Sequence, residues 1–223
     1  MLEGVDSGLK KISGYIYIIV GAALIILAAV IIKNNFDENS EAGAASDELL
    51  AGVIDQMPSV VLPGEESGPM PVADFGGRSF VGTVEIPSLS LLLPIQDEWS
   101  SENAKVAVCR YKGSVYDGDL IVCGHNYSEH FGTLPNLEIG SDVIVTDMNG
   151  KSFYYKVSNI ETLGAYDVSE MESGQWDFTM FTCTIGGANR VTIRCEATGR
   201  ESETGVEPDV IKAARESKHI RKK

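Results

Sequence analysis

Residues 179–191 read TMFTCTIGGANRV, and this stretch decides both the fold that we predict and the site that we predict within it. An apolar run ends at Cys183, a Gly186-Gly187 pair follows, and a second run begins at Arg190. Paired glycines between two apolar runs are typical of a chain reversal. The pattern predicts antiparallel strands over 178–183 and 190–195, which would bring Arg190 within reach of Cys183.

Strand-like runs of the same kind continue outward over residues 79–199. Short segments rich in β-branched and aromatic residues alternate with turn residues, and Asn149-Gly150 is a strong hairpin signal. Helical periodicity is weak except around residues 168–174. About eight strands at regular spacing favour a closed barrel or a sandwich, so the predicted fold is mainly β with short helices.

An uncharged apolar segment at 12–32 precedes this domain. As a helix it would extend roughly 30 Å, which is the thickness of the hydrocarbon core of a membrane. The run is longer than the apolar region of a signal peptide and ends in polar residues rather than in a small-residue cleavage site. We therefore favour an uncleaved transmembrane signal anchor over a signal peptide.

Charges that flank this segment predict its orientation. Lys10 and Lys11 precede it, whereas Lys33 alone follows it before a run of acids. The positive-inside rule then predicts a short cytoplasmic N-terminus at 1–11, a single pass through the cell membrane and an extracellular domain.

Two further segments flank the predicted domain. Residues 33–78 are rich in Ala, Gly, Ser, Pro and acids and predict a flexible acidic stalk, in which 47–57 could form a short helix. A lid over an active site is the alternative for this segment. Residues 200–223 form a charged tail that is basic at its end. A solvated, frayed tail is the simpler interpretation, and contact with anionic lipid or wall polymer is the alternative.

Composition and motifs exclude several classes of function. The formal net charge of -14 argues against a nucleic-acid partner, which would need a basic surface. The sequence has no Cys-x-x-Cys, no closely spaced His pair, no Gly-x-Ser-x-Gly elbow and no Gly-rich phosphate loop. We therefore expect neither a metal centre nor a cofactor.

Four cysteines lie in the predicted external part: Cys109, Cys123, Cys183 and Cys195. An even count in an oxidising compartment is typical of two disulfides. Each cysteine, however, sits inside an apolar, strand-like run, where a free thiol behaves as a small hydrophobic side chain. We expect most of them to be buried thiols that stay reduced, and Cys183 to be the exception.

Cys183 would need partners to act as a nucleophile, because an unperturbed thiol is only a few per cent thiolate at neutral pH. His125, at the end of a strand-like run and next to Gly124, can supply a base. Arg190 can supply positive charge where an oxyanion develops. Arg194 is a possible rival of Arg190, but it lies further along the predicted strand.

These residues resemble the active-site motifs of the sortase family, the cysteine transpeptidases of Gram-positive cell surfaces. The sequence TMFTC at 179–183 matches the family's Thr-Leu-x-Thr-Cys motif, with a methionine in place of leucine that conserves volume. Gly124-His125 is similar to the context of the family's histidine, and Arg190 to that of its arginine. The sequence GTVEIPSLSLLLPI at 82–95 resembles the first strands of the family's barrel. The resemblance covers roughly residues 80–198.

The resemblance implies an eight-stranded sortase β-barrel at 79–199 that cleaves a C-terminal sorting signal of the Leu-Pro-x-Thr-Gly type between Thr and Gly. Cys183 would form a thioester, and His125 would exchange protons with the leaving and incoming amines. Arg190 would stabilise the oxyanion, and Thr182 would bind the signal. The implied partners are surface proteins or pilins with such signals, and an amine of a peptidoglycan precursor or of a pilin lysine.

Alternatives remain open within and beyond this family. Pilin-polymerising sortases usually have a second membrane span and a lid with an Asp-Pro pair, which this sequence lacks, so we favour the anchoring type. Some members bind calcium before the cysteine strand, where this chain has Glu170, Glu172 and Asp177, but solvated acids are the simpler interpretation. A hydrolytic cysteine peptidase and a non-catalytic, membrane-tethered peptide-binding β domain are the competing functions.

Overall fold

The computed structural model describes residues 3–63, 67–201 and 205–221. The chain divides into two units, one up to Glu41 and one from Ala42 onward. The long helix α1, Glu3–Gln56, forms the first unit and continues into the second. Its apolar side chains from Tyr15 to Ile32 are exposed, and among the described residues it is the one helix long and apolar enough to cross a membrane.

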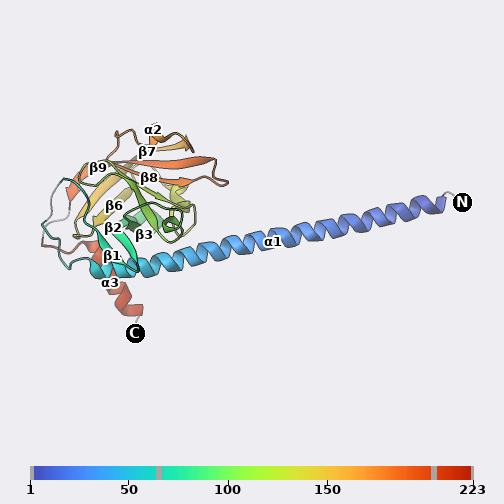
Figure 1. Cartoon of the computed structure of the whole chain (residues 1–223), viewed down its shortest axis with the longest axis horizontal. Coiled ribbons are helices and arrows are strands. Elements are labelled where there is room, and N and C mark those ends of the chain that lie inside the picture. Colours follow the sequence, from blue (N-terminus) through green and yellow to red (C-terminus); the bar gives the residue numbers. More distant parts are fainter. Residues whose placement is uncertain (1–2, 64–66, 202–204, 222–223) are drawn as a thin grey trace. The chain divides into compact units, whose positions relative to one another are not determined.

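The second unit is built on a closed β-barrel (Figure 1). The sheet order is β1-β2-β3-β4-β5-β8-β9-β7-β6, and β2 also pairs with β6, so that eight strands close into a barrel while β1 extends one edge of β2. This arrangement confirms the predicted mainly β barrel. The strands are β1 Ala73–Phe75, β2 Arg78–Ile86, β3 Leu91–Gln96, β4 Val108–Lys112, β5 Leu120–Gly124, β6 Asp142–Asp147, β7 Ser152–Gly164, β8 Phe178–Cys183 and β9 Asn189–Glu201.

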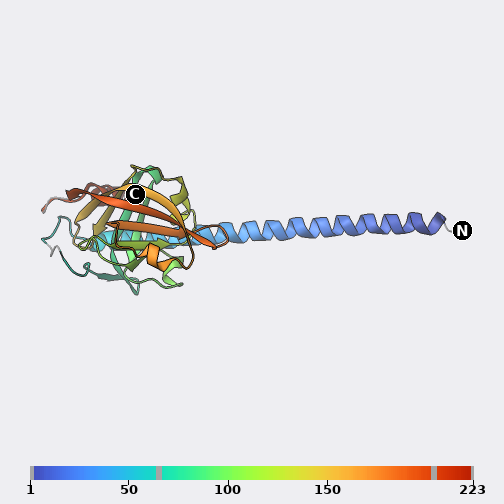
Figure 2. The ribbon, with the colours of Figure 1, turned by 90° about the horizontal axis from the view of Figure 1, so that it is seen from above.

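Apolar residues alternate along the strands, and their side chains fill the barrel interior. Figure 2 shows the ribbon of the barrel from a second side. Val84, Ile95, Val122, Met180 and Ile193 come from five different strands and are fully buried in one cluster. Residues two apart on a strand point to the same face, so each strand contributes several side chains to this core. The polar faces and loops are left for the solvent and for the site.

One glycine permits the closure between β2 and β6. Gly82 has φ +152, and a Cβ atom there would lie 2.0 Å from the backbone oxygen of Thr146 on β6. Any larger side chain would push the two strands apart at this point. The close approach of the two backbones therefore depends on the absence of a side chain at Gly82.

The remaining helices are short. The α2 helix lies within 168–174, where the sequence has its clearest helical periodicity in this region, and α3 occupies most of the predicted tail. The helices other than α1 are η1 Pro87–Leu89, η2 Asn103–Lys105, η3 Phe131–Asn136, α2 Val168–Met171 and α3 Asp209–Arg221.

The segment at 33–78 differs from the predicted flexible stalk, because its first part, through Gln56, is helical. Val53, Ile54 and Met57 recur at helical spacing and pack with Phe80 in a second apolar cluster. The sequence predicts a possible helix only over 47–57, whereas in the structure this helix is continuous with the apolar segment. The stalk residues 64–66 lie outside the described residues.

The C-terminal tail also has more structure than the frayed tail that we preferred. Ile211 of α3 is fully buried in the cluster with Ile54 and Met57. Arg215 of α3 donates hydrogen bonds to the carbonyl oxygens of Ile54 at 3.1 Å and Met57 at 2.6 Å, where the last carbonyls of α1 need donors. The tail residues 202–204 and 222–223 lie outside the described residues, and the five-part division of the chain stays a prediction.

Candidate active site

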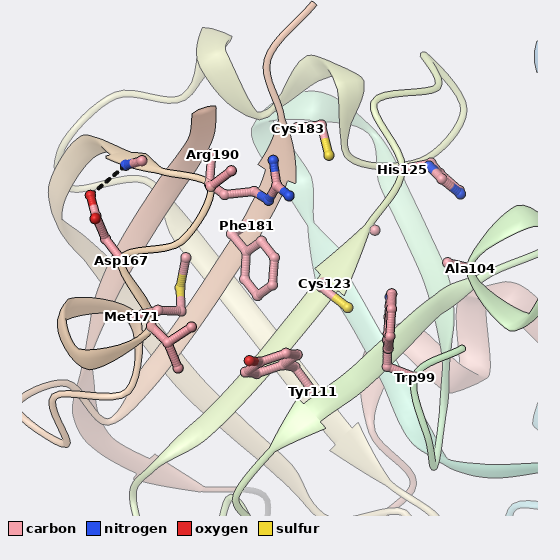
Figure 3. Close-up of a pocket in the computed structure, with 14 residues that line it drawn as sticks. Trp99, Ala104, Tyr111, Cys123, His125, Asp167, Met171, Phe181, Cys183 and Arg190 are labelled. Atoms are coloured by element: carbon pink, nitrogen blue, oxygen red, sulfur yellow. Dashed lines mark hydrogen bonds between the residues drawn. The ribbon is translucent and has the colours of Figure 1, made fainter. Parts of the chain in front are cut away.

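A pocket of about 340 Å³ opens at the ends of β5 and β8 (Figure 3). The β4, β5, β8 and β9 strands supply its floor, and the loops after β3 and β7 supply its sides. It brings the three predicted catalytic residues together. The lining residues are Trp99, Ala104, Tyr111, Cys123, Gly124, His125, Gly164, Ala165, Asp167, Val168, Met171, Phe181, Cys183 and Arg190.

Strand register explains why Cys183 and Arg190 meet. The β8 and β9 strands are antiparallel, and Cys183 is the direct cross-strand partner of Arg190. The turn between them passes through Gly186 (φ 84) and Gly187 (φ 76), a left-handed conformation that glycine adopts without strain. The predicted hairpin and the proximity of the two side chains are thus confirmed.

A parallel pair of strands brings His125 to the same place. The β5 strand runs parallel to β8, and Gly124 is the partner of Thr182. His125 directly follows Gly124, and Cys183 directly follows Thr182. In Figure 3 Cys183 lies between Arg190 and His125.

Thr182 has a different surrounding from the other three predicted site residues. Its side chain is buried, and its hydroxyl donates a hydrogen bond of 2.9 Å to the carbonyl oxygen of Gly124. It does not belong to the pocket lining. The contact fastens the end of β8 to the end of β5, directly beside Cys183 and His125. Its role in substrate binding stays a prediction.

Burial affects the protonation of His125. Loss of solvent lowers the pKa of the imidazole from its ordinary value of 6.5, and the positive charge of Lys105 lowers it further. Both effects disfavour the imidazolium form. His125 is therefore held mainly neutral at physiological pH, as a base that can take up a proton.

Arg190 and Arg194 have different surroundings. The Arg190 side chain is half-buried at the pocket and donates hydrogen bonds of 3.0 and 3.1 Å to the carbonyl oxygens of Gly187 and Asn189. Arg194 is buried, pairs across the strands with Thr179, and does not line the pocket. Of the two arginines only Arg190 can reach a ligand bound next to Cys183.

The other three cysteines are buried free thiols. Burial raises the pKa of Cys109 to about 12 and also raises the pKa values of Cys123 and Cys195. A thiol with a raised pKa carries almost no thiolate and is a poor nucleophile. Cys123 and Cys183 both line the pocket, but Cys123 is buried whereas Cys183 is only partly buried and so is the more accessible to a substrate.

Aromatic and aliphatic side chains make most of the pocket lining, and no sequence pattern predicts them. Tyr111 and Phe181 pack edge to face with ring centroids 5.5 Å apart. Trp99 comes from the loop after β3, and Val168 and Met171 come from α2. Single apolar residues in irregular loops have no periodicity that would have marked them in advance.

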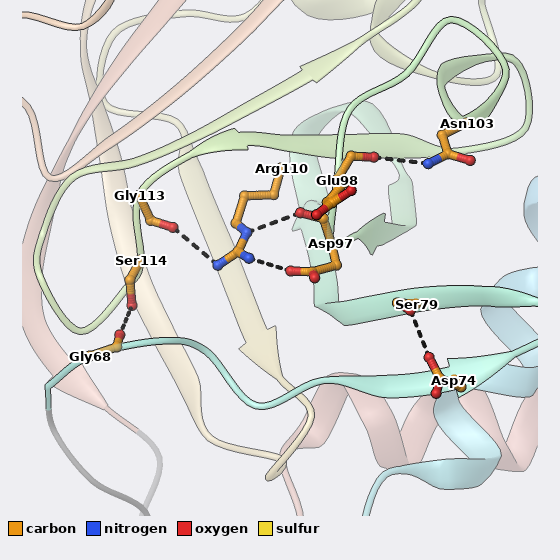
Figure 4. Close-up of polar contacts among 9 residues, drawn as sticks. All are labelled: Gly68, Asp74, Ser79, Asp97, Glu98, Asn103, Arg110, Gly113 and Ser114. Atoms are coloured by element: carbon orange, nitrogen blue, oxygen red, sulfur yellow. Dashed lines mark hydrogen bonds and ion pairs between the residues drawn. The ribbon is translucent and has the colours of Figure 1, made fainter.

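Polar contacts hold the Trp99 loop in place (Figure 4). Arg110 of β4 forms an ion pair with Asp97, and its Nε donates a hydrogen bond of 3.1 Å to the Asp97 carbonyl oxygen. Asn103 donates from its side chain to the carbonyl oxygen of Glu98 at 3.0 Å. These bonds fix both ends of the loop that brings Trp99 and Ala104 to the pocket.

The acids considered for calcium have other contacts. Glu172 forms an ion pair of 2.5 Å with Lys112, and Asp177 accepts a hydrogen bond of 2.7 Å from the backbone nitrogen of Ala197. Within the described ranges no group of three or more His, Cys, Asp or Glu side chains is arranged to hold a metal ion.

His130, just beyond the pocket, makes stability depend on pH. It is fully buried, and burial lowers its pKa from 6.5 to about 4. A folded-state pKa below the unfolded value means that protonation favours the unfolded chain. The contribution of the neutral ring is complete above about pH 6.5 and is lost as the pH falls toward 4, by about 3 kcal/mol at most.

We therefore expect the thermal midpoint of the full chain in detergent to fall between pH 6.5 and pH 4, measured by tryptophan fluorescence. His130→Phe should flatten this profile, because it removes the group that protonates. His125→Gln serves as the control and should keep most of the slope. An equally steep decline in His130→Phe would contradict the assignment.

Comparison with known proteins gave a family match over the barrel. The family model described as Sortase domain matches residues 84–198. No curated protein matched the chain. Among solved structures, sortase C1 from Streptococcus agalactiae has 23% identity and a TM-score of 0.49, covering 57% of this chain and 72% of its own.

Two further solved structures are similarly distant. A sortase D5 transpeptidase from Clostridium perfringens has 15% identity and a TM-score of 0.49, covering 75% of this chain and 98% of its own. Sortase A from Listeria monocytogenes has 18% identity and a TM-score of 0.49, covering 60% and 94%. Likenesses at this distance do not assign a subclass.

Proposed function

The chain belongs to the sortase family of cysteine transpeptidases, and from that premise we propose that it joins proteins with a Leu-Pro-x-Thr-Gly-like signal to an amine at the cell surface. The observation that carries the proposal is the meeting of Cys183, His125 and Arg190 at one pocket. These three side chains provide a nucleophile, a proton carrier and a fixed positive charge.

The first half of the reaction forms an acyl-enzyme. Neutral His125 accepts the thiol proton of Cys183, and the resulting thiolate attacks the carbonyl carbon of the signal's Thr, so that a C–S bond forms while the carbonyl oxygen becomes an oxyanion. Collapse of this intermediate breaks the C–N bond between Thr and Gly. The protonated form of His125 gives its proton to the departing amine, which leaves a thioester and a neutral imidazole.

The second half transfers the acyl group. An incoming amine attacks the thioester carbon and loses a proton to neutral His125, and the C–S bond breaks to regenerate the Cys183 thiolate. The new C–N bond is an amide. The lowered pKa of His125 favours the neutral form that this step needs.

Arg190 and Thr182 assist both halves in this proposal. The Arg190 guanidinium lies opposite Cys183 and stabilises the oxyanion, with donors that its bonds to the turn carbonyls leave available. Thr182 supports binding of the signal by fastening the strand end that carries Cys183. Neither role needs a metal or a cofactor.

The pocket wall fits an apolar peptide. Tyr111, Phe181, Val168 and Met171 offer apolar surface next to the nucleophile, which suits the Leu-Pro part of the signal. This apolar surface would hold an extended peptide while the carbonyl group of its Thr lies at Cys183.

The membrane and the partners complete the proposal. The apolar part of α1 would anchor the enzyme as a single span, with a cytoplasmic N-terminus and the barrel outside. The acyl donors would be surface proteins or pilins with C-terminal sorting signals. The acceptor would be an amine of a peptidoglycan precursor or of a pilin lysine, with the anchoring type favoured.

The test is an amine-competition assay with the full chain in detergent. Peptides of the Leu-Pro-x-Thr-Gly type are incubated with and without oligoglycine, and products are separated by mass spectrometry. We expect an amide product that grows with amine concentration and a free acid when amine is absent. Free acid alone, at every concentration of several different amines, would instead support a hydrolytic peptidase. No Cys183-dependent product from any peptide would favour a non-catalytic binding domain.

A further inference from the structure

Arg194 makes the densest set of buried hydrogen bonds around the pocket without lining it. Its side chain is only 2% exposed. Nε donates to Glu161 Oε1 at 2.7 Å, and Nη1 donates to Thr179 Oγ1 at 3.1 Å. These partners lie on β7 and β8, so the guanidinium joins the two neighbours of its own strand β9.

The same guanidinium also reaches the loop between β7 and β8. Nη1 donates to the carbonyl oxygen of Met171 at 3.0 Å, and Nη2 donates to that of Glu170 at 2.7 Å. Both carbonyls belong to the end of α2, where helical carbonyls lack internal partners and carry partial negative charge. Arg194 therefore caps α2 from inside the protein.

The α2 helix needs such a tether. It has four residues, Val168–Met171, and a single helical turn has almost no stability of its own. The ion pair of Lys112 with Glu172, whose side chains are 49% and 26% exposed, contributes little. At the other end of α2, the carboxylate of Asp167 accepts a hydrogen bond of 2.7 Å from the backbone nitrogen of Gly164. The buried ties that hold α2 are the hydrogen bonds of Arg194 and the side chain of Met171.

The α2 helix connects Arg194 to the pocket. Asp167, Val168 and Met171 form one wall of the pocket, opposite the wall with Trp99. We infer that Arg194, paired with Glu161, is a positioning residue that fixes this wall in the place where it can hold an apolar peptide beside Cys183. The inference rests on the proposed function, because it assigns the wall to binding of the sorting signal.

Arginine suits this position for a geometric reason. The planar guanidinium presents donors in several directions at once, and here it serves a carboxylate, a hydroxyl and two carbonyls. A lysine ammonium keeps the charge, but its three donors sit on one nitrogen and cannot reach all four acceptors. Arg194→Lys therefore keeps the positive charge at this position but removes the arrangement of donors that the guanidinium provides.

The experiment compares Arg194→Lys and Glu161→Gln with the parent, all as full chains in detergent. Tyr116→Phe is the matched control, because it removes a partly buried hydrogen bond, to Asp147, at a residue that does not line the pocket. We expect Arg194→Lys to raise KM for the signal peptide about tenfold or more with a smaller change in kcat, since the loss is one of binding. Glu161→Gln should act in the same direction but less, and Tyr116→Phe should leave KM unchanged.

A second readout does not depend on activity. Hydrogen–deuterium exchange of residues 165–177 should be faster in Arg194→Lys than in the parent, and unchanged in Tyr116→Phe. Unchanged exchange in Arg194→Lys would overturn the inference, and so would faster exchange with an unaltered KM. If the parent itself gives no product, the proposed function fails, and the exchange data alone decide whether Arg194 holds α2.

Discussion

Replacing Cys183 by alanine is expected to abolish the acyl-enzyme and to lower transpeptidation by a factor on the order of 10³ or more, because the nucleophile of both half-reactions is removed. Intact-mass spectrometry of the full chain after mixing with a signal peptide measures the thioester directly. The parent should gain the mass of the acyl fragment, whereas Cys183→Ala should gain none. Product formation with oligoglycine should fall in parallel.

Cys109→Ala is the matched control for that experiment. Cys109 is buried and lies outside the pocket lining, and burial raises the pKa of its thiol to about 12. This variant should still form the acyl-enzyme, with a change in stability but not in the site of acylation. A peptide adduct that persists in Cys183→Ala, or disappears only in Cys109→Ala, would reject Cys183 as the nucleophile.

The second large effect is expected at Arg190. Arg190→Met removes the positive charge opposite Cys183, and loss of one oxyanion donor typically lowers kcat by about 10²–10³. Arg190→Lys should recover only part of this loss, since an ammonium does not reproduce the directions of the guanidinium donors. Steady-state kinetics with the signal peptide and oligoglycine give the comparison.

A remote arginine controls for general effects of losing a cation. Arg215 binds the carbonyl oxygens at the end of α1 and does not line the pocket. Arg215→Met should lower the thermal midpoint but keep kcat near the parent value. A kcat for Arg190→Met within about twofold of the parent would remove Arg190 from the mechanism.

Local patterns in the sequence were enough to predict that Arg190 lies opposite Cys183. The Gly186-Gly187 turn sets the register of β8 against β9, and register alone brings Arg190 opposite Cys183. Position along the strand favours Arg190 over Arg194 as the partner of Cys183, but it does not explain what Arg194 does, because residues four apart on a strand point to the same face. The role of Arg194 depends on burial and on Glu161, which comes from another strand.

The parts that escaped prediction depend on long-range packing. Trp99 reaches the pocket because Arg110 holds the start of its loop at Asp97, and no local pattern encodes that contact. The second part of α1 is helical where composition indicated a flexible stalk, since Val53 and Ile54 gain partners in Phe80 and in Ile211 of the distant tail. Amphipathic segments of this kind are stabilised by what they pack against rather than by their own propensity.

The parallel pairing of β5 with β8 has a consequence for how such an enzyme can change its choice of substrate. Cys183 and His125 lie at the ends of adjacent strands, and the hydrogen bond from Thr182 to Gly124 joins the residues that precede them. Both pocket walls, in contrast, are formed by the loops after β3 and β7. In the proposed function, chemistry and recognition are therefore encoded in separate segments. Exchange of the loop at 97–107 or at 165–177 can redirect the enzyme to new signals while the reacting groups stay in register. The condition is that Arg110 and Arg194, which hold these two loops, keep their partners.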